Sequence, residues 1–285
     1  MPSRYILTLV CPDRPGIVHA VCSGLLEVGG NIVENAQFGD TESNRFCMRT
    51  LFDAEVAGDG APGKIHDAVA AQLNDPAAAL TVRPADTRHR VLIMVSGFDH
   101  CLVDLLYRWR TGKLAVDIAA IVSNHTACAS LAGQHGIPYV HLPMTRDNKP
   151  EQEAALVELI DRHEIDLVVL ARYMQILSDK LCEVLQGRAI NIHHSFLPGF
   201  KGAKPYHQAH ERGVKLVGAT AHFVTADLDE GPIIEQDVAR VNHAHTVEQL
   251  TSLGQDIERM VLARAVHYFS EDRVLLVGKR TVVFP

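Results

Sequence analysis

The sequence predicts an α/β protein of two domains, in which a ferredoxin-like βαββαβ unit precedes a doubly wound domain with a mainly parallel sheet. Three observations support this prediction. The chain has 285 residues, more than the commonest single domain contains. Residues 1–85 show the order strand, helix, strand, strand, helix, strand. Past Arg90, short apolar strands alternate with helices, which is typical of a parallel sheet.

Glycine and proline residues delimit the elements of the first domain. The apolar run at 5–10 stops at a turn, and the helical spacing of apolar residues that follows stops at Gly29 and Gly30. We expect strands over 5–10, 31–38, 45–54 and 80–83, and helices over 17–28 and 65–73. This order can close into an antiparallel sheet with two helices on one face. Residues 84–87 are the expected linker, so the predicted domains are 1–85 and 86–285.

The second domain contains apolar strands with few interruptions. The segment DLVVLA, at 166–171, suits a sheet that is covered on both faces. We expect strands over 91–95, 115–122, 139–142 and 167–170, and helices over 102–109, 127–135 and 151–163. Mixed strand additions, a long helix over 247–268 and a pair of strands around Gly278 and Lys279 complete this domain.

Composition and charge exclude several classes of partner. A net charge of −7 without long charged runs argues against nucleic-acid binding. The six cysteines never have the spacing of metal ligands, and several lie in apolar runs, so we expect free thiols in a reducing compartment. No stretch reaches about 18 uninterrupted apolar residues, and the N-terminal apolar run is too short for a signal peptide. We therefore expect a cytoplasmic protein with no membrane partner.

Polar residues concentrate in two segments, each of which contains an apolar run. The first, AINIHHSFLPGFKG at 189–202, carries Asn191, His193 and His194. The second, GATAHFVTADLDEGP at 218–232, supplies His222, Asp227, Asp229 and Glu230. Open α/β sheets place their chemistry at strand ends, where side chains are rigidly held and still accessible. The two segments together predict a site with imidazoles and a carboxylate.

The order Asn191-Ile192-His193, Ser195 to Pro198 and then Asp229 in LDEGP resembles the signature of the folate-dependent formyltransferase fold, over residues 90–241. The resemblance implies that Asn191, His193 and Asp229 transfer a formyl group from 10-formyltetrahydrofolate. Chemistry agrees, because an amide and a protonated imidazole can hydrogen-bond an oxyanion, which is worth about 3 to 4 kcal/mol per donor. Asp229 can orient water and accept its proton, and burial would raise its pKa and improve it as a base.

The segment LARYMQILS, at 170–178, resembles the folate-binding loop of that family. The resemblance implies that its backbone groups read the edge of a pterin ring while apolar side chains wall it. The predicted substrate-binding residues are Met174, Gln175, Ile176, Leu177, Val224, Ala226, Leu228 and His194. Two of these keep a second interpretation: Met174 also suits a core position, and His194 is either a proton shuttle or a packed loop residue.

The acceptor of the formyl group follows from what the chain lacks. The family's purine-pathway transferase needs a glycine-rich phosphate turn after its first strand, and here that turn reads Ser-Gly-Phe-Asp-His at 96–100. Phe98 blocks close backbone approach, and the carboxylate of Asp99 repels a phosphate, although Asp99 also suits a helix N-cap. The acidic balance opposes transfer to a tRNA. Water remains as the acceptor.

Two glycine-containing loops of the first domain resemble the ligand loops of ACT-type regulatory domains, which bind amino acids at paired interfaces. The candidate effector residues are Asp13, Gly16, Gly30 and Asn31, although turn chemistry also accounts for the glycines. The whole chain is thus similar to the formyltetrahydrofolate deformylase family, which joins such a domain to the formyltransferase core. The resemblance implies a homo-oligomer that uses folate and water as substrates. No prosthetic group or metal is expected, because HExxH and paired cysteines are absent.

Other interpretations remain open from the residues alone. His222 suits either a core histidine or a support of the site, and Ser195 suits a loop hydroxyl because no Gly-x-Ser-x-Gly elbow surrounds it. The enzyme could instead pass the formyl group to a small amine or sugar nucleotide. A non-catalytic sensor of folate and amino acids is the remaining alternative, although intact Asn191, His193 and Asp229 argue against it.

Overall fold

The computed structural model describes residues 2–197 and 205–285, so the last part of the AINIHHSFLPGFKG segment lies outside the described residues. The chain divides into two units, one made of Met1–Thr87 with Glu271–Pro285 and the other of Arg88–Ser270. The sequence placed residues 271–285 in the second domain, and the structure groups them with the first. No helix among the described residues is both long enough and apolar enough to cross a membrane.

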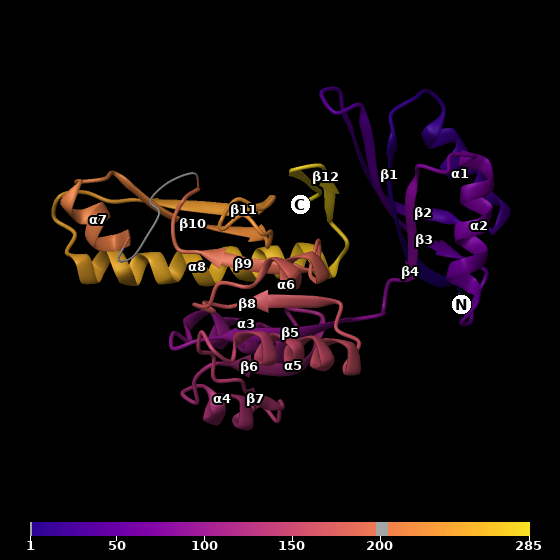
Figure 1. The fold of residues 1–285 in the computed structure, drawn as a ribbon. Coiled ribbons are helices and arrows are strands. Elements are labelled where there is room, and N and C mark those ends of the chain that lie inside the picture. The colour runs from indigo at the N-terminus through magenta and orange to yellow at the C-terminus, as the bar shows by residue number, and fades with distance from the viewer. Residues whose placement is uncertain (1, 198–204) are drawn as a thin grey trace. The chain divides into compact units, whose positions relative to one another are not determined.

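The first unit has the predicted βαββαβ order. Its elements are β1 (Ser3–Pro12), α1 (Ile17–Glu27), β2 (Asn31–Asp40), β3 (Arg45–Ala54), α2 (Ala61–Leu73) and β4 (Ala79–Pro84). The strands form an antiparallel sheet in the order β2-β3-β1-β4 (Figure 1). Alternate residues of β1, such as Leu7 and Leu9, are buried in one core with Val21 of α1 and Ile65 of α2. The two helices therefore cover one face of the sheet.

A C-terminal hairpin packs on this unit. It consists of β12 (Val274–Val277) and β13 (Arg280–Val283). A buried cluster joins the hairpin to Cys47 of β3, and its other members are Leu275, Val277 and Phe284. This cluster is separate from the core that β3 shares with the two helices. Arg49 Nε adds a hydrogen bond of 2.8 Å to the carbonyl of Glu271. These contacts are the reason why the last residues group with the first unit.

The second unit alternates strands and helices. Its elements are β5 (His89–Val95), α3 (His100–Arg110), β6 (Val116–Ser123), α4 (Ala129–Gln134), β7 (Tyr139–His141), α5 (Lys149–Arg162), β8 (Leu167–Leu170), α6 (Asp179–Val184), β9 (Ala189–His193), α7 (Pro205–Glu211), β10 (Leu216–Phe223), β11 (Ile233–Arg240) and α8 (Val247–Ser270). The sheet order is β11-β10-β9-β8-β5-β6-β7, and the five strands from β9 to β7 are parallel. This confirms a mainly parallel sheet with mixed additions.

Helices cover both faces of this sheet. Helix α8 packs against α3 and along β9, β10 and β11 (Figure 1). Residues of α5 and α6 share a buried cluster with Leu92 and Met94 of β5, which alternate with Ile93 along the strand. All three of these side chains are almost fully buried, as expected for a strand that is covered on both sides.

The topology brings two loops to one place. Strands β8 and β9 are parallel, so the loop after Leu170 and the residues after His193 lie at the same edge of the sheet. Strand β10 runs antiparallel to β9 and places His222 opposite Asn191. The loop after β10 then turns back, because Gly231 approaches the carbonyl of Phe223 so closely that no side chain would fit there. This return brings Asp229 to the site.

Candidate active site

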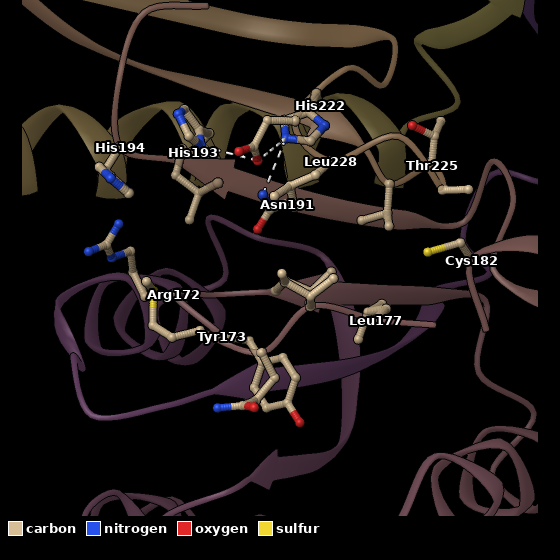
Figure 2. Close-up of a pocket in the computed structure, with 18 residues that line it drawn as sticks. Arg172, Tyr173, Leu177, Cys182, Asn191, His193, His194, His222, Thr225 and Leu228 are labelled. Atoms are coloured by element: carbon tan, nitrogen blue, oxygen red, sulfur yellow. Dashed lines mark hydrogen bonds and ion pairs between the residues drawn. The ribbon is translucent and has the colours of Figure 1, made fainter. Parts of the chain in front are cut away.

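A cavity of about 250 Å³ opens between the β8 loop, strand β9 and the loop after β10. The structure places every predicted catalytic and substrate-binding residue along it (Figure 2). These residues are Met174, Gln175, Ile176, Leu177, Asn191, His193, His194, Val224, Ala226, Leu228 and Asp229. Ser195 is buried and does not line this cavity, in line with a role in the loop.

Hydrogen bonds fix the loop from 172 to 178 on the rim of the cavity. Ser96 Oγ accepts from the backbone N–H of Met174 at 2.9 Å, and Glu153 Oε1 accepts from that of Ser178 at 2.9 Å. Met174 is 53% exposed and Ile176 is 64% exposed. The core interpretation of Met174 is therefore wrong, and both apolar side chains are available to a ligand.

His193 and Asp229 are the closest pair of titratable side chains in the cavity. His193 Nδ1 lies 3.1 Å from Asp229 Oδ1, and His193 is 7% exposed. A carboxylate only accepts hydrogen bonds, so Nδ1 carries a proton and Nε2 is the atom left for a substrate. His193 Nε2 is buried and has no hydrogen-bond partner among the described residues. Such an atom is costly unless a ligand or water completes its bonding.

The environment of Asp229 overturns one expectation. Burial raises the pKa of this carboxyl, but the hydrogen bond and charge of His193, together with His222, outweigh burial and lower it. The predicted raised pKa is therefore wrong, because the fold brings two imidazoles from other parts of the chain to this carboxylate. Asp229 also adopts a left-handed backbone with φ 58°, a conformation that Asp tolerates better than most residues.

His222 supports the site through Asn191. Its Nδ1 lies 2.8 Å from the carbonyl of Phe223 and must donate, since a carbonyl only accepts. Burial, foremost, lowers the pKa of His222, so its Nε2 carries no proton and accepts from Asn191 Nδ2 at 3.2 Å (Figure 2). The second N–H of this amide remains for a ligand. Of the two interpretations of His222, the structure favours support of the site.

His194 stacks on His193, with ring centroids 4.9 Å apart. Burial and then the charge of Arg172 lower the pKa of His194 to about 4. The ring is therefore neutral near pH 7, and it lines the cavity without adding charge.

Arg172 lines the cavity and was not singled out in the sequence. Its guanidinium carbon lies 5.3 Å from the ring centre of Phe98, within range of a cation–π contact. The ring of Phe98, in the turn at 96–100, is therefore in contact with a side chain of the protein. Asp99 is at the N-cap of α3, as predicted, but its side chain accepts no capping hydrogen bond from the described residues.

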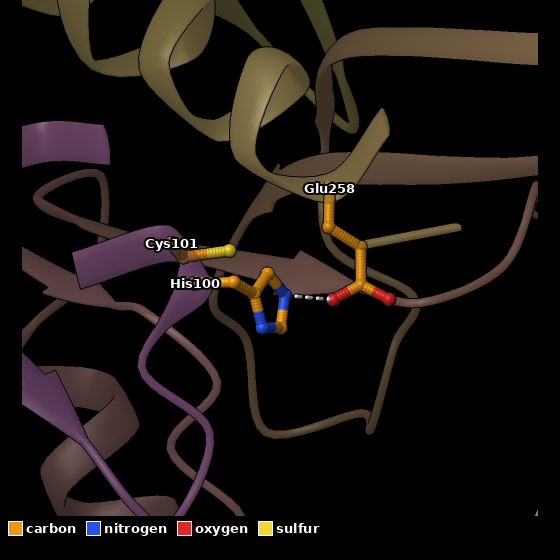
Figure 3. A group of neighbouring side chains, drawn as sticks. All are labelled: His100, Cys101 and Glu258. Carbon is orange, nitrogen blue, oxygen red and sulfur yellow. Dashed lines mark hydrogen bonds and ion pairs between the residues drawn. The ribbon is translucent and has the colours of Figure 1, made fainter. Parts of the chain in front are cut away.

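His100, Cys101 and Glu258 form a cluster whose spacing could suit a metal ion (Figure 3). The carboxylate of Glu258 is already occupied: Tyr206 donates to Oε1 at 2.8 Å, and His100 Nε2 lies 2.7 Å from Oε2. Burial raises the pKa of the Cys101 thiol well above its usual value. A neutral thiol and a committed carboxylate make a poor metal site.

Of the candidate effector residues of the first unit, Asn31 lines a hollow. This shallow hollow is also lined by Pro2, Gly29, Asp53 and Glu55, whereas Asp13, Gly16 and Gly30 are not among its lining residues. Gly16 has φ 91° before helix α1, and the N–H of Gly30 bonds the carbonyl of Leu25 at 2.8 Å. The two ends of helix α1 therefore account for both glycines.

Comparisons with known proteins show which families and structures this chain resembles. The formyl transferase family model matches residues 89–266. A formyltetrahydrofolate deformylase of Corynebacterium sp. (strain P-1) is 49% identical over 98% of each chain, and one of Bacillus subtilis (strain 168) is 46% identical over 98% of this chain and 93% of its own. The crystal structure of the Burkholderia mallei deformylase is 51% identical, with a TM-score of 0.94 over both full chains. Glycinamide ribonucleotide transformylase 1 of Symbiobacterium toebii is 32% identical, with a TM-score of 0.65 over 70% of this chain and 95% of its own.

Proposed function

Because the chain belongs to the formyltetrahydrofolate deformylase family, we infer that it hydrolyses 10-formyltetrahydrofolate to formate and tetrahydrofolate. The observation that carries the catalytic assignment is the coupled set around Asp229, in which two histidines and an asparagine converge on one cavity. A site that only binds folate has no need of this arrangement.

The reaction adds water across an amide bond. The water oxygen bonds the formyl carbon, and the carbonyl electrons move onto oxygen to give a tetrahedral oxyanion. When this intermediate collapses, the bond from carbon to N10 breaks, N10 takes a proton, and formate and one proton leave. We propose that His193 Nε2 and the second N–H of Asn191 donate to the oxyanion, which is where preorganised donors contribute most.

We propose two roles for Asp229. In this proposal both ring nitrogens of His193 act as donors, and the ionised carboxylate 3.1 Å from Nδ1 offsets the positive charge of that ring. It also accepts the proton of the attacking water. The lowered pKa makes it a weaker base than one with a raised pKa, but ensures that it is ionised near neutral pH.

The folate is proposed to lie along the 172–178 loop. Backbone groups of Gln175, Ile176 and Leu177 suit the alternating donors and acceptors of the pterin edge. The side chains of Met174 and Leu228 are more than half exposed at the cavity and offer apolar surface to the rings. No prosthetic group or metal has a part in this proposal.

Formate release in the absence of an amine tests the choice of water as the acceptor. We expect the pure protein to release formate from 10-formyltetrahydrofolate stoichiometrically with tetrahydrofolate, measured by a coupled formate assay. Release that starts only when a small amine is added would instead support a formyltransferase. No turnover under either condition would leave the sensor alternative.

We further propose that the first unit is an ACT-type domain that binds an amino-acid effector and pairs in a cytoplasmic homo-oligomer. Its βαββαβ order and antiparallel sheet support this. Strand β2 is at the edge of that sheet and exposes Ile32, Val33 and Phe38. Such an edge favours pairing with another strand. Light scattering is expected to give a mass of at least two chains, and a monomeric mass would contradict the proposal.

A further inference from the structure

The cavity holds one permanent positive charge. Among the described residues that line it, Arg172 is the only lysine or arginine. Burial, before any other cause, lowers the pKa values of His194 and His222, so neither ring supplies a charge near neutral pH. Hydrolysis nevertheless creates an anion here, because formate is ionised at pH 7, and the carboxylate of Asp229 in the same cavity repels it.

Arg172 is held firmly while its donors stay available. Its side chain is 11% exposed, and its backbone has the left-handed φ of 63°. Its Nε lies 3.4 Å from Glu258 Oε2, close enough for an ion pair, but the buried N–H has no hydrogen-bond partner within the described part of the chain. Among the described residues, no hydrogen bond uses the guanidinium. The end of this side chain points toward His194 at one end of the cavity (Figure 2).

Glu258 explains how the guanidinium of Arg172 can be buried while its N–H groups have no hydrogen-bond partner among the described residues. The carboxylate is 1% exposed, and hydrogen bonds to Tyr206 and His100 already occupy its two oxygens. It therefore offsets the charge of Arg172, which makes the burial tolerable, without consuming the N–H groups of the guanidinium. Phe98 stacks on the guanidinium and restricts its position further.

We propose that Arg172, positioned by Glu258, forms a subsite for the formate product, a small carboxylate anion, beside the formyl-binding groups Asn191 and His193. A planar guanidinium with free N–H groups matches the two oxygens of a carboxylate. As the bond from carbon to N10 breaks, negative charge spreads over the two oxygens of the departing formate. The guanidinium of Arg172 then donates hydrogen bonds to these oxygens. This assignment rests on the proposed function, because it takes formate to be the product.

Binding of ¹³C-formate to the full-length protein, followed by NMR line broadening without folate, tests the subsite directly. Arg172→Gln is expected to weaken formate binding at least tenfold, because a charge-assisted hydrogen bond to a buried group is lost. Arg172→Lys keeps the charge and should retain binding better than Arg172→Gln. Arg108→Gln removes the same charge from a helix away from the cavity, and should bind formate like the wild type.

Arg172→Gln leaves Glu258 buried without its ion-pair partner. We therefore measure the double variant Arg172→Gln/Glu258→Gln beside it, in which both side chains are neutral. In this variant Glu258→Gln keeps the shape of the glutamate and removes its charge, so no unpaired buried charge remains, and circular dichroism checks the fold. Wild-type formate affinity in either variant, or no saturable formate binding by the wild type, would overturn the subsite. Formate release from 10-formyltetrahydrofolate is scored separately, so failure of the proposed function is distinguished from failure of the subsite.

Discussion

Asp229→Asn is expected to lower kcat by about three orders of magnitude while the protein stays folded. The amide has nearly the same shape as the carboxylate, but it can neither accept the proton of water nor stabilise a charged His193. The hydrogen bond between His193 Nδ1 and residue 229 either is lost or has a neutral acceptor in place of a charged one. The unfolding free energy should therefore change by at most about 2 kcal/mol. Steady-state kinetics and urea unfolding measure the two effects.

Asp227 supplies the matched control for this variant. It lies on the same loop, is exposed, and is not among the residues that line the cavity. Asp227→Asn changes charge and shape in the same way and should keep wild-type kcat and KM. Near-normal turnover in Asp229→Asn would remove the carboxylate from the chemistry, while equal losses in both variants would point to the loop as a whole.

Asn191→Ala is expected to lower kcat by about two to three orders of magnitude, the usual effect of removing one oxyanion donor. His222→Leu should lower kcat as well, because Asn191 loses the acceptor that orients its amide. The smaller effect is expected for His222, since it does not contact the substrate in our proposal. KM should change less than kcat in both variants, because the interaction is made mainly in the transition state.

A double variant tests whether His222 acts through Asn191 or independently of it. If His222 acts through Asn191, then Asn191→Ala/His222→Leu should be no slower than Asn191→Ala alone. Multiplied losses would show that His222 has a separate role, for example through its nitrogen 3.8 Å from Asp229 Oδ1. Because His222 is almost fully buried, unfolding of each variant is measured beside its kinetics.

The sequence was informative where a signal is local. Apolar runs located the strands of both units, and Asn191 and His193 stood out because they end such a run. The loop at 172–178 was found through its resemblance, and the structure places it at the cavity. These features depend on neighbours in the chain, which a sequence shows directly.

Features that depend on distant contacts were missed. Arg172 follows a strand, and a charged residue at that place usually points into solvent. Its partner Glu258 lies on the last long helix, where nothing in the local sequence marks it as a buried ion-pair partner. The pairing of Asn191 with His222 depends on the register between β9 and β10. The lowered pKa of Asp229 depends on the contacts that bring His193 and His222 to its carboxylate.

The placement of residues 271–285 has a consequence for synthesis. The first unit also needs residues 271–285, because the hairpin of β12 and β13 buries one side of β3 around Cys47. A ribosome must therefore deliver the entire second unit before the first can be finished. The N-terminal unit begins to form first but is completed only when residues 271–285 have emerged, so this surface of β3 stays uncovered until then.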